Sequence, residues 1–420
     1  METTHSIEKS AAWLYVRRVP DRSHPLPASF RLACACANWP PSATRDAAVR
    51  AAATGVDWES FLRVSGRQRI RPLALAALEA AGVSPPEPAA TKLALNAEAQ
   101  SARSLALAAE SLRLRALIEA DGVEVLFVKG ATLAQLAYGD PALKHCRDID
   151  LLVHPRDAER AFQRLRGEGY VGAGPERDLS DTQRRTLYRL RKDMELTHPA
   201  RRLNVELHWR LVDNPVLLKE VGLGSPAQEV AVMDGRLRTL ADSQLFAYLC
   251  VHGATHSWFR LKWLADLNAW LARKTDAEIE GFYRDARRLG VEACAAQALI
   301  LRERLLGSPV PPALATALDG RKTRVLVAAA LDAMVGGDGE TELSARPWGS
   351  FRLLRPQFLR GRGLAFHLAQ WRMMAASLDD ALTLPLPKPL RFLYPPLRLP
   401  LWLLRIHRRR RRRLATLDAG

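Results

Sequence analysis

Two acidic residues stand at a spacing that suits metal binding. Asp148 and Asp150 are separated by one apolar residue and followed by three more, a pattern that predicts a β-strand. Side chains two positions apart on a strand point to the same face. Adjacent carboxylates repel each other unless a cation lies between them, and Mg²⁺ prefers hard oxygen ligands. The pair is a candidate metal clamp, while a solvated strand end is the common alternative for an isolated Asp-x-Asp.

A third acid, Glu206, lies in a second predicted strand, where it shares a face with His208. If this strand lies beside the first, three carboxylates meet at one point and can hold two divalent cations. Two such metals would activate an attacking oxygen and stabilise a leaving pyrophosphate. His208 is also a candidate for the neighbour that orients Glu206.

A phosphate-binding segment is predicted at Lys129 and Gly130, directly after the apolar run 123–128. Glycine permits close approach of the backbone, and the N-terminus of the helix expected at 132–138 attracts anions. Lys129 adds a positive charge for the same phosphates. This context favours the metal clamp over the solvated strand end.

His252 and His256 are four residues apart and face the same side of a predicted helix. They either line the cleft opposite the acids and contact substrate or phosphate, or pack within the helices, or bind zinc. No Glu follows His252, which excludes the zinc-protease motif. Arg260 and Lys262 are candidates for triphosphate contacts, and Asp266 for the acid that holds one of them. Ordinary surface charge is the alternative for all three.

The elements that must position these residues alternate between about 121 and 212. Strands are predicted at 123–128 and 148–153, helices at 132–138 and 155–167, and a hairpin at 194–198 and 203–208. Helices are predicted on both sides of this core, with Asp57 as one N-cap. We divide the chain into a disordered N-terminus, a helical region, a core, a second helical region and a Pro/Leu-rich and Arg-rich basic tail, at residues 1–27, 28–120, 121–240, 241–384 and 385–420.

The composition is that of a globular protein, with 48% hydrophobic and 25% charged residues. No apolar stretch reaches the length of about 18 residues that spans a bilayer, and residues 1–27 do not resemble a secretory signal. We therefore expect a cytoplasmic protein. The five irregularly spaced cysteines predict free thiols rather than disulfides or a zinc site.

The positive charge is concentrated at the C-terminal end. Residues 386–420 hold ten Lys or Arg and one acid, so they carry +9 of the net +17. The run Arg408 to Arg413 would attract any polyanion, which makes RNA or an anionic membrane surface a possible contact. A solvated terminal extension is the alternative.

Several separated motifs resemble those of the bacterial uncharacterised nucleotidyltransferase family, within the DNA polymerase beta-like nucleotidyltransferase superfamily. The matching segments are Lys129-Gly130-Ala131, Tyr138 to Pro141, Arg147 to Val153, Glu206 to Trp209 and the helical signature His252 to Asp266. The resemblance covers roughly residues 28–400. It implies an α+β fold, in which a small nucleotidyltransferase α/β core of mixed sheet and helices is embedded between N-terminal and C-terminal helical regions.

The resemblance also implies an activity and a set of site residues. A nucleoside monophosphate would pass from an NTP to an unknown acceptor, with Mg²⁺ or Mn²⁺ held by Asp148, Asp150 and Glu206. Nucleotide contacts would come from Lys129, Gly130, Ala131, Arg147, His252, His256, Arg260 and Lys262. Ala131 replaces the serine that is usual in the superfamily. This departure favours the alternative hypothesis, a catalytically degenerate binding protein that uses its basic tail to reach RNA or an anionic membrane, whereas the full set of three acids favours the enzyme.

Overall fold

The computed structural model describes residues 26–335, 354–375, 378–397, 400–401 and 404. Most of the N-terminal segment expected to be disordered, and the whole of the arginine run, lie outside these residues. Within them, no helix combines the length and apolar character needed to cross a membrane.

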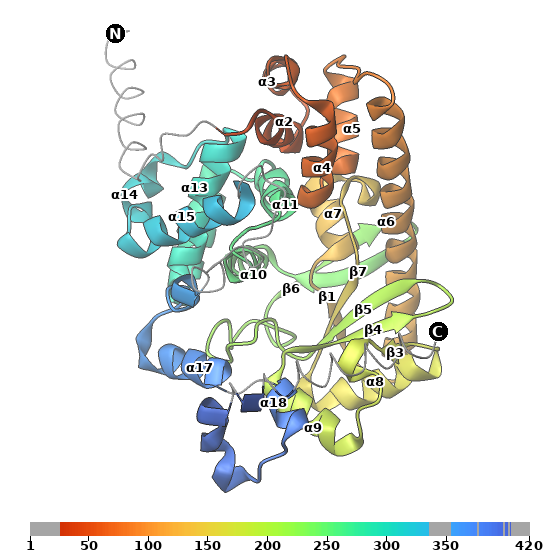
Figure 1. The fold of residues 1–420 in the computed structure, drawn as a ribbon, viewed down its shortest axis with the longest axis vertical. Helices are drawn as coiled ribbons and strands as arrows, with labels where there is room; N and C mark the ends of the chain where they lie inside the picture. The colour runs from red at the N-terminus through yellow and green to blue at the C-terminus, as the bar shows by residue number, and fades with distance from the viewer. Residues whose placement is uncertain (1–25, 336–353, 376–377, 398–399, 402–403, 405–420) are drawn as a thin grey trace.

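A mixed sheet with strand order β1-β2-β5-β4-β3 lies near the middle of the molecule in Figure 1. Its strands are β1 (Val125–Phe127), β2 (Ile149–Val153), β3 (Val171–Gly172), β4 (Asp193–His198) and β5 (Leu203–His208). β2 and β5 are parallel, whereas the other neighbours are antiparallel. The predicted α+β fold is confirmed, and the two strands expected to carry the acids are direct neighbours.

Three helices accompany the sheet: α7 (Gly130–Tyr138), α8 (Ala158–Gly167) and α9 (Asp181–Leu190). The first two match predicted helices, whereas α9 and the short β3 were not predicted. Short 3₁₀ segments, η2 (Pro141–Leu143), η3 (Pro155–Asp157) and η4 (Gly174–Glu176), complete the connections. The η2 turn and the residues after it lead directly into β2.

A separate hairpin, β6 (Ala227–Val232) and β7 (Gly235–Leu240), was missed by the sequence reasoning. It contacts β1, α6 and α7. Its tight turn contains Met233 in the left-handed region (φ 52°) beside Asp234-Gly235. An Asp-Gly pair between alternating apolar residues is a recognised hairpin signal, so this element was within reach of the sequence.

Helices precede and follow the core, as predicted. The N-terminal set is α2 (Ala28–Ala37), α3 (Ala43–Ala53), α4 (Trp58–Gln68), α5 (Arg71–Ala80) and α6 (Ala89–Ala120). The carboxylate of Asp57 accepts hydrogen bonds from the backbone N–H groups of Glu59 and Ser60, which confirms its role as N-cap of α4.

The C-terminal set begins with α10 (Asp242–Thr255), α11 (Leu261–Leu271), α12 (Asp276–Arg288) and α13 (Glu292–Leu306). It continues through η5 (Pro312–Leu314), α14 (Ala315–Leu318), α15 (Arg321–Val335), α17 (Gly363–Ala375), α18 (Leu378–Thr383) and η7 (Lys388–Leu393).

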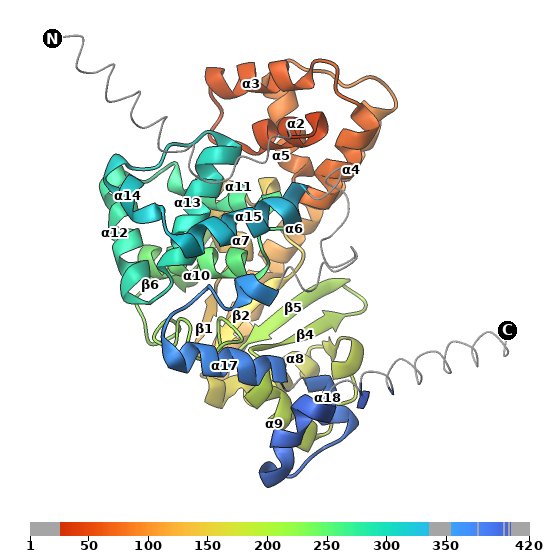
Figure 2. The same cartoon turned by 60° about the vertical axis from the view of Figure 1, so that its left-hand side comes forward.

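Two large hydrophobic cores hold these elements. The first joins the N-terminal helices to α10, α11, α13 and α15, with Phe30, Phe61 and Trp270 fully buried in it. The second lies between the sheet, α6 and α8, around Leu151 and Val205. The two helical regions thus share one core, which lies on one side of the sheet in both views (Figures 1 and 2). All five cysteines are buried free thiols, as predicted.

Candidate metal and nucleotide site

The parallel pairing of β2 and β5 places Asp150 directly opposite Glu206. Alternation along β5 buries Val205 and Leu207 in the core on one face and leaves Glu206 and His208 on the other. The prediction that Glu206 and His208 share a face is confirmed. The condition on which the three-acid site depended, two acidic strands side by side, is met.

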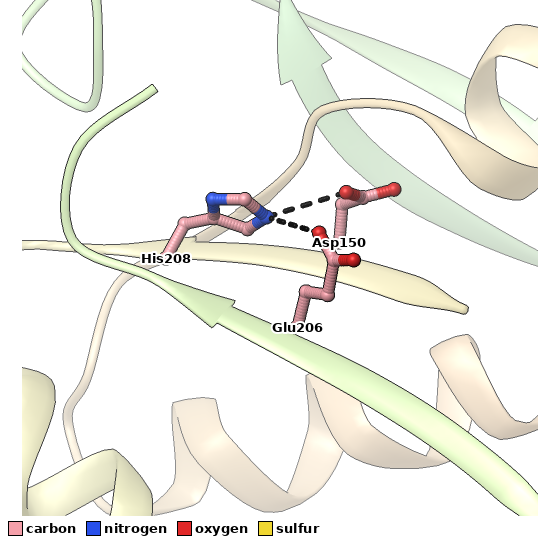
Figure 3. Close-up of side chains that lie close together, drawn as sticks. All are labelled: Asp150, Glu206 and His208. Atoms are coloured by element: carbon pink, nitrogen blue, oxygen red, sulfur yellow. Dashed lines mark hydrogen bonds and ion pairs between the residues drawn. The ribbon is translucent and has the colours of Figure 1, made fainter. Parts of the chain in front are cut away.

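The side chains of Asp150, Glu206 and His208 form a compact cluster whose donor atoms lie within 4.8 Å of one another. Figure 3 shows the imidazole facing both carboxylates: Nε2 of His208 is 3.3 Å from Oδ1 of Asp150 and 3.2 Å from Oε2 of Glu206. Asp150 and His208 are buried, whereas the Glu206 side chain is 29% exposed. Two carboxylates and one imidazole nitrogen make a donor set that fits a divalent cation.

Neighbouring basic side chains offset the negative charges of the two carboxylates. Nζ of Lys129 lies 2.7 Å from Oδ1 of Asp150. Burial alone would raise the pKa of Asp150, but the Lys129 ammonium and the His208 hydrogen bond hold it well below its ordinary value. Burial and the charge of Asp150 would raise the pKa of Glu206, but the His208 hydrogen bond and the charges of Lys129 and His208 together lower it. Both acids are therefore ionised at neutral pH.

Asp148 lies immediately before β2, because the strand begins at Ile149. It is half-buried and is not a member of the 4.8 Å cluster found among the described residues, where His208 takes the third place. Burial and the charges of Asp150 and Glu206 raise its pKa. The three predicted acids thus share one neighbourhood. The position of His208 beside Glu206 could be predicted from the sequence, since it lies two positions after Glu206 on the same strand.

The predicted phosphate-binding segment adjoins the acids. α7 begins at Gly130, whose φ of 61° lies in the left-handed region that favours glycine. No side chain caps this helix end. Ala131 is buried in the core beside the sheet, and Arg147 is exposed. Lys129 and Gly130 therefore stand next to Asp150 and Asp148.

His252 and His256 lie at the end of α10, with ring centroids 4.8 Å apart. Both pack against the indole of Trp263, at 5.3 and 5.1 Å. His256 is exposed, whereas His252 is half-buried, and burial followed by the charge of Lys129 lowers the pKa of His252 well below its ordinary value. Neither histidine belongs to a group of three metal-donor side chains in the described part of the chain. This finding does not support zinc binding by the two histidines.

The geometry around the two histidines depends on Gly253. A Cβ atom there would clash with the ring of Trp258, which is fully buried. Ser257 and Trp258 both have positive φ, at 48° and 50°. This strained turn ends α10 and redirects the chain toward α11.

The cations after this turn have different surroundings. Arg260 donates to the backbone oxygen of Arg67 and lies over the ring of Phe259, with 4.8 Å to the centroid. Nζ of Lys262 donates to the backbone oxygen of His145 at 3.1 Å. Both residues therefore join separate chain segments, and Lys262 also lies close enough to Asp148 to feel its charge.

Asp266 holds a different cation from the two expected. Its Oδ2 accepts from Nζ of Lys144 at 2.6 Å, and its Oδ1 from the hydroxyl of Tyr138 at 3.0 Å. The expectation that it holds Arg260 or Lys262 is corrected, because Lys144 fills that place. The lysine comes from the segment between η2 and β2, far from Asp266 in the sequence. Nothing local in the sequence pointed to the pair.

A cavity of about 490 Å³ lies beyond the carboxyl ends of β2 and β5. Leu152, His154, Trp209 and Leu211 are among the residues that line it. It adjoins the cluster along both strands but contains none of the predicted site residues.

Comparison with known proteins identifies a family. A family model described as uncharacterised nucleotidyltransferase matches residues 54–307, which is more than half of the chain. The match runs from just before α4 to the end of α13 and includes all of the acids and cations described above. No curated protein matches the chain.

Proposed function

The chain belongs to the family of uncharacterised nucleotidyltransferases, and from that premise we propose that it is a metal-dependent nucleotidyltransferase. It would transfer a nucleoside monophosphate from an NTP to an acceptor hydroxyl or amine and release pyrophosphate. The observation that carries this proposal is the β2–β5 register, which puts Asp150 beside Glu206 and His208 with donor atoms within 4.8 Å.

The donor set suits Mg²⁺ or Mn²⁺. We assign Asp148, Asp150 and Glu206 as ligands, with His208 either joining them or orienting Glu206. Carboxylate oxygens are preferred by both ions, and imidazole is more readily accepted by transition metals such as Mn²⁺. When bound, the cations would polarise the α-phosphate and offset the charge of the leaving pyrophosphate.

The protein side chains divide the remaining work. Glu206 is the open member of the cluster and is ionised, so it can accept the proton of the acceptor oxygen or nitrogen. Lys129 contacts Asp150 directly, so its ammonium is within reach of a phosphate held at the same carboxylate. The backbone N–H groups at Gly130 and Ala131, at the start of α7, are suited to a phosphate oxygen.

The remaining nucleotide contacts are proposed from the predicted residues around the acids. Lys262 and Arg147 would meet the phosphates, and His252 and His256 would line the opposite side of the site. Arg260 would contribute indirectly by holding this segment in place, since its guanidinium donates a hydrogen bond to the backbone oxygen of Arg67.

Isothermal titration calorimetry with Mg-ATP and Mg-CTP tests the assignment. We expect the wild-type protein to bind at least one of them only with the divalent cation present. The double variant Asp148→Asn/Asp150→Asn should lose this heat, because it removes the ligand charges while keeping side-chain size. Asp178→Asn, an exposed acid in the same core, is the matched control and should bind as wild type.

Unchanged metal-dependent binding in the double variant would show that the site lies elsewhere. A wild-type protein without any metal-dependent nucleotide heat would instead favour the binding protein that reaches a polyanion through its basic tail. The observation that favours this second candidate is Ala131, which stands where the superfamily usually has serine.

A further inference from the structure

Large apolar side chains are exposed mainly in the C-terminal part of the molecule. Eleven such side chains are exposed among the residues that the structure describes, and eight of them lie between residues 354 and 404. The other three are Leu95 and Leu105 on α6 and Met233 in the β6–β7 turn. Single exposed apolar residues are ordinary on a protein surface, whereas their concentration in one segment marks a surface for interaction.

Three of these residues form a stripe along α17, which we call the outer stripe: Leu364, Leu368 and Trp371. They are four and three positions apart, a spacing that puts them on one face of the helix. Their exposed fractions are 76%, 47% and 62%. A surface helix normally turns its apolar face inward and its polar face to the solvent. The outer stripe of α17 reverses this rule.

Contacts on the inner face of α17 fix this orientation. Phe366 is fully buried in the first hydrophobic core. The side-chain amide of Asn214 donates to Oε1 of Gln370 at 3.1 Å and to the backbone oxygen of Phe366 at 3.3 Å. Gln370 is itself buried. Because these contacts hold the inner face against the body of the protein, the outer stripe remains on the surface.

The outer stripe is accompanied by positive charge. Arg362 lies directly before α17 and Arg372 directly follows Trp371, and both arginines are exposed. Residues 354–420 hold fourteen Lys or Arg and three acids, so this part of the sequence carries +11 of the net +17. The segment that exposes most of the apolar side chains is therefore also the most basic one.

The position of α17 leaves room for a large partner. In both views the helix lies at the end of the molecule opposite the N-terminal helices α2 to α5 (Figures 1 and 2). A helix at the periphery can meet an extended surface without a rearrangement of the core.

The combination of apolar side chains and cations restricts the partner. A second copy of the chain would bring two positively charged surfaces together, and their repulsion opposes such a dimer. A nucleic acid would match the arginines, but its interfaces are polar and offer little apolar area to Leu364 and Leu368. An anionic bilayer offers negative headgroups and an apolar layer below them, and Trp is enriched at that boundary.

We propose that the outer stripe of α17 docks on an anionic membrane surface. Leu364, Leu368 and Trp371 enter the boundary between headgroups and acyl chains, while Arg362 and Arg372 meet the lipid phosphates. This inference does not depend on the proposed function, because none of these residues belongs to the metal and nucleotide site.

Flotation of the full-length protein with vesicles tests the inference. One vesicle preparation contains phosphatidylcholine alone, and the other contains phosphatidylcholine and phosphatidylglycerol in equal parts. The variant Leu364→Gln/Leu368→Gln replaces two exposed leucines of the outer stripe. Leu95→Gln/Leu105→Gln makes the same change at two exposed positions of α6, which are 62% and 39% exposed, and is the matched control. Thermal melts check that both variants are folded.

We expect the wild type to float with the anionic vesicles and much less with the neutral ones, and added salt should weaken the binding by screening the arginines. Leu364→Gln/Leu368→Gln should lower partition onto the anionic vesicles by about 10- to 100-fold, because two leucines lose their burial in the membrane. The α6 control should match the wild type. Arg372→Gln should lower partition onto the anionic vesicles alone, by about fivefold.

Vesicle binding at wild-type strength in Leu364→Gln/Leu368→Gln would overturn the inference and would assign the contact to the run Arg408 to Arg413. A wild type that does not bind anionic vesicles would also overturn it, as would an equal loss in the α6 control. Two measurements identify the other partners. A dimer in sedimentation velocity, or binding of polyuridylate, that only the stripe variant loses would assign the outer stripe to a second copy or to RNA.

The proposed function is tested separately by the nucleotide titration. The stripe variants should bind Mg-nucleotide as the wild type does. A wild type that floats with anionic vesicles but binds no nucleotide would refute the proposed function and support the membrane contact.

Discussion

Replacing Asp266 with asparagine should destabilise the fold strongly, because it breaks a buried ion pair from one side only. Asp266 and Lys144 are 3% and 5% exposed, and their charged atoms lie 2.6 Å apart. Asparagine keeps the shape and can still accept a hydrogen bond from Tyr138. It leaves the Lys144 ammonium buried without its counter-charge, and an unpaired buried charge is what makes such a substitution destabilising.

The expected cost in the free energy of unfolding is about 3 kcal/mol, at the lower end of the range of about 3–5 kcal/mol for a broken buried pair. The asparagine oxygen offsets part of the loss. Domains are stable by only about 5–15 kcal/mol, so a change of this size should be clear in urea denaturation. Loss of the pair should also loosen the segment from Lys144 into β2, which positions Asp148.

A double-mutant cycle gives the decisive comparison. Lys144→Met combined with Asp266→Asn removes the orphaned charge, so the double variant should be less destabilised than the sum of the single variants, by about 2 kcal/mol. Glu220→Gln is the control, since Glu220 belongs to an exposed pair with Lys219 whose atoms are 3.8 Å apart. A cost under about 1 kcal/mol for Asp266→Asn, or additive single variants, would refute the buried pair.

Two further predictions concern the turn after α10 and the edge of the sheet. Gly253→Ala should lower the melting temperature and weaken nucleotide binding together, because its Cβ would displace the buried Trp258 ring beside the two histidines; unchanged melting and binding would contradict this. Burial raises the pKa of Glu176 to about 7, above about 4.3 in an unfolded chain. The folded state then binds more protons between these values, so stability falls as pH rises from about 4 to 7. Glu176→Gln should flatten this fall in thermal melts recorded across that pH range, and an unaltered profile would show that another group causes it.

The acidic strands could be predicted because their signals are local. In Leu203–His208 the alternation of apolar and polar residues fixes which side chains share a face, whatever the rest of the chain does. The pairing of this strand with β2 was stated only as a condition, since strand order is set by packing across the whole sheet. The structure supplied the register that puts Asp150 opposite Glu206.

The parts that escaped prediction depend on contacts between distant segments. Lys144 and Asp266 are 122 positions apart, and each alone looks like a surface charge. The β6–β7 hairpin is different, since its Asp234-Gly235 pair was a local signal that the reasoning passed over.

The acidic and basic side chains of the site come from the elements that surround two different hydrophobic cores. The acids Asp150 and Glu206 belong to the sheet, where two ionised carboxylates at facing positions would repel each other without a cation. The antiparallel pairing of β1 with β2 supplies Lys129 at this point, and the backbone bond from Val128 to Asp150 (3.3 Å) fixes it there.

The second cation, Lys262, comes from the helical core and lies without an ion-pair partner among the described residues. One half of the site thus attracts divalent cations, and the other attracts anions. A neutral ligand would satisfy neither half. A nucleoside triphosphate with its metal ions, the substrate that we propose, carries both charges in one molecule.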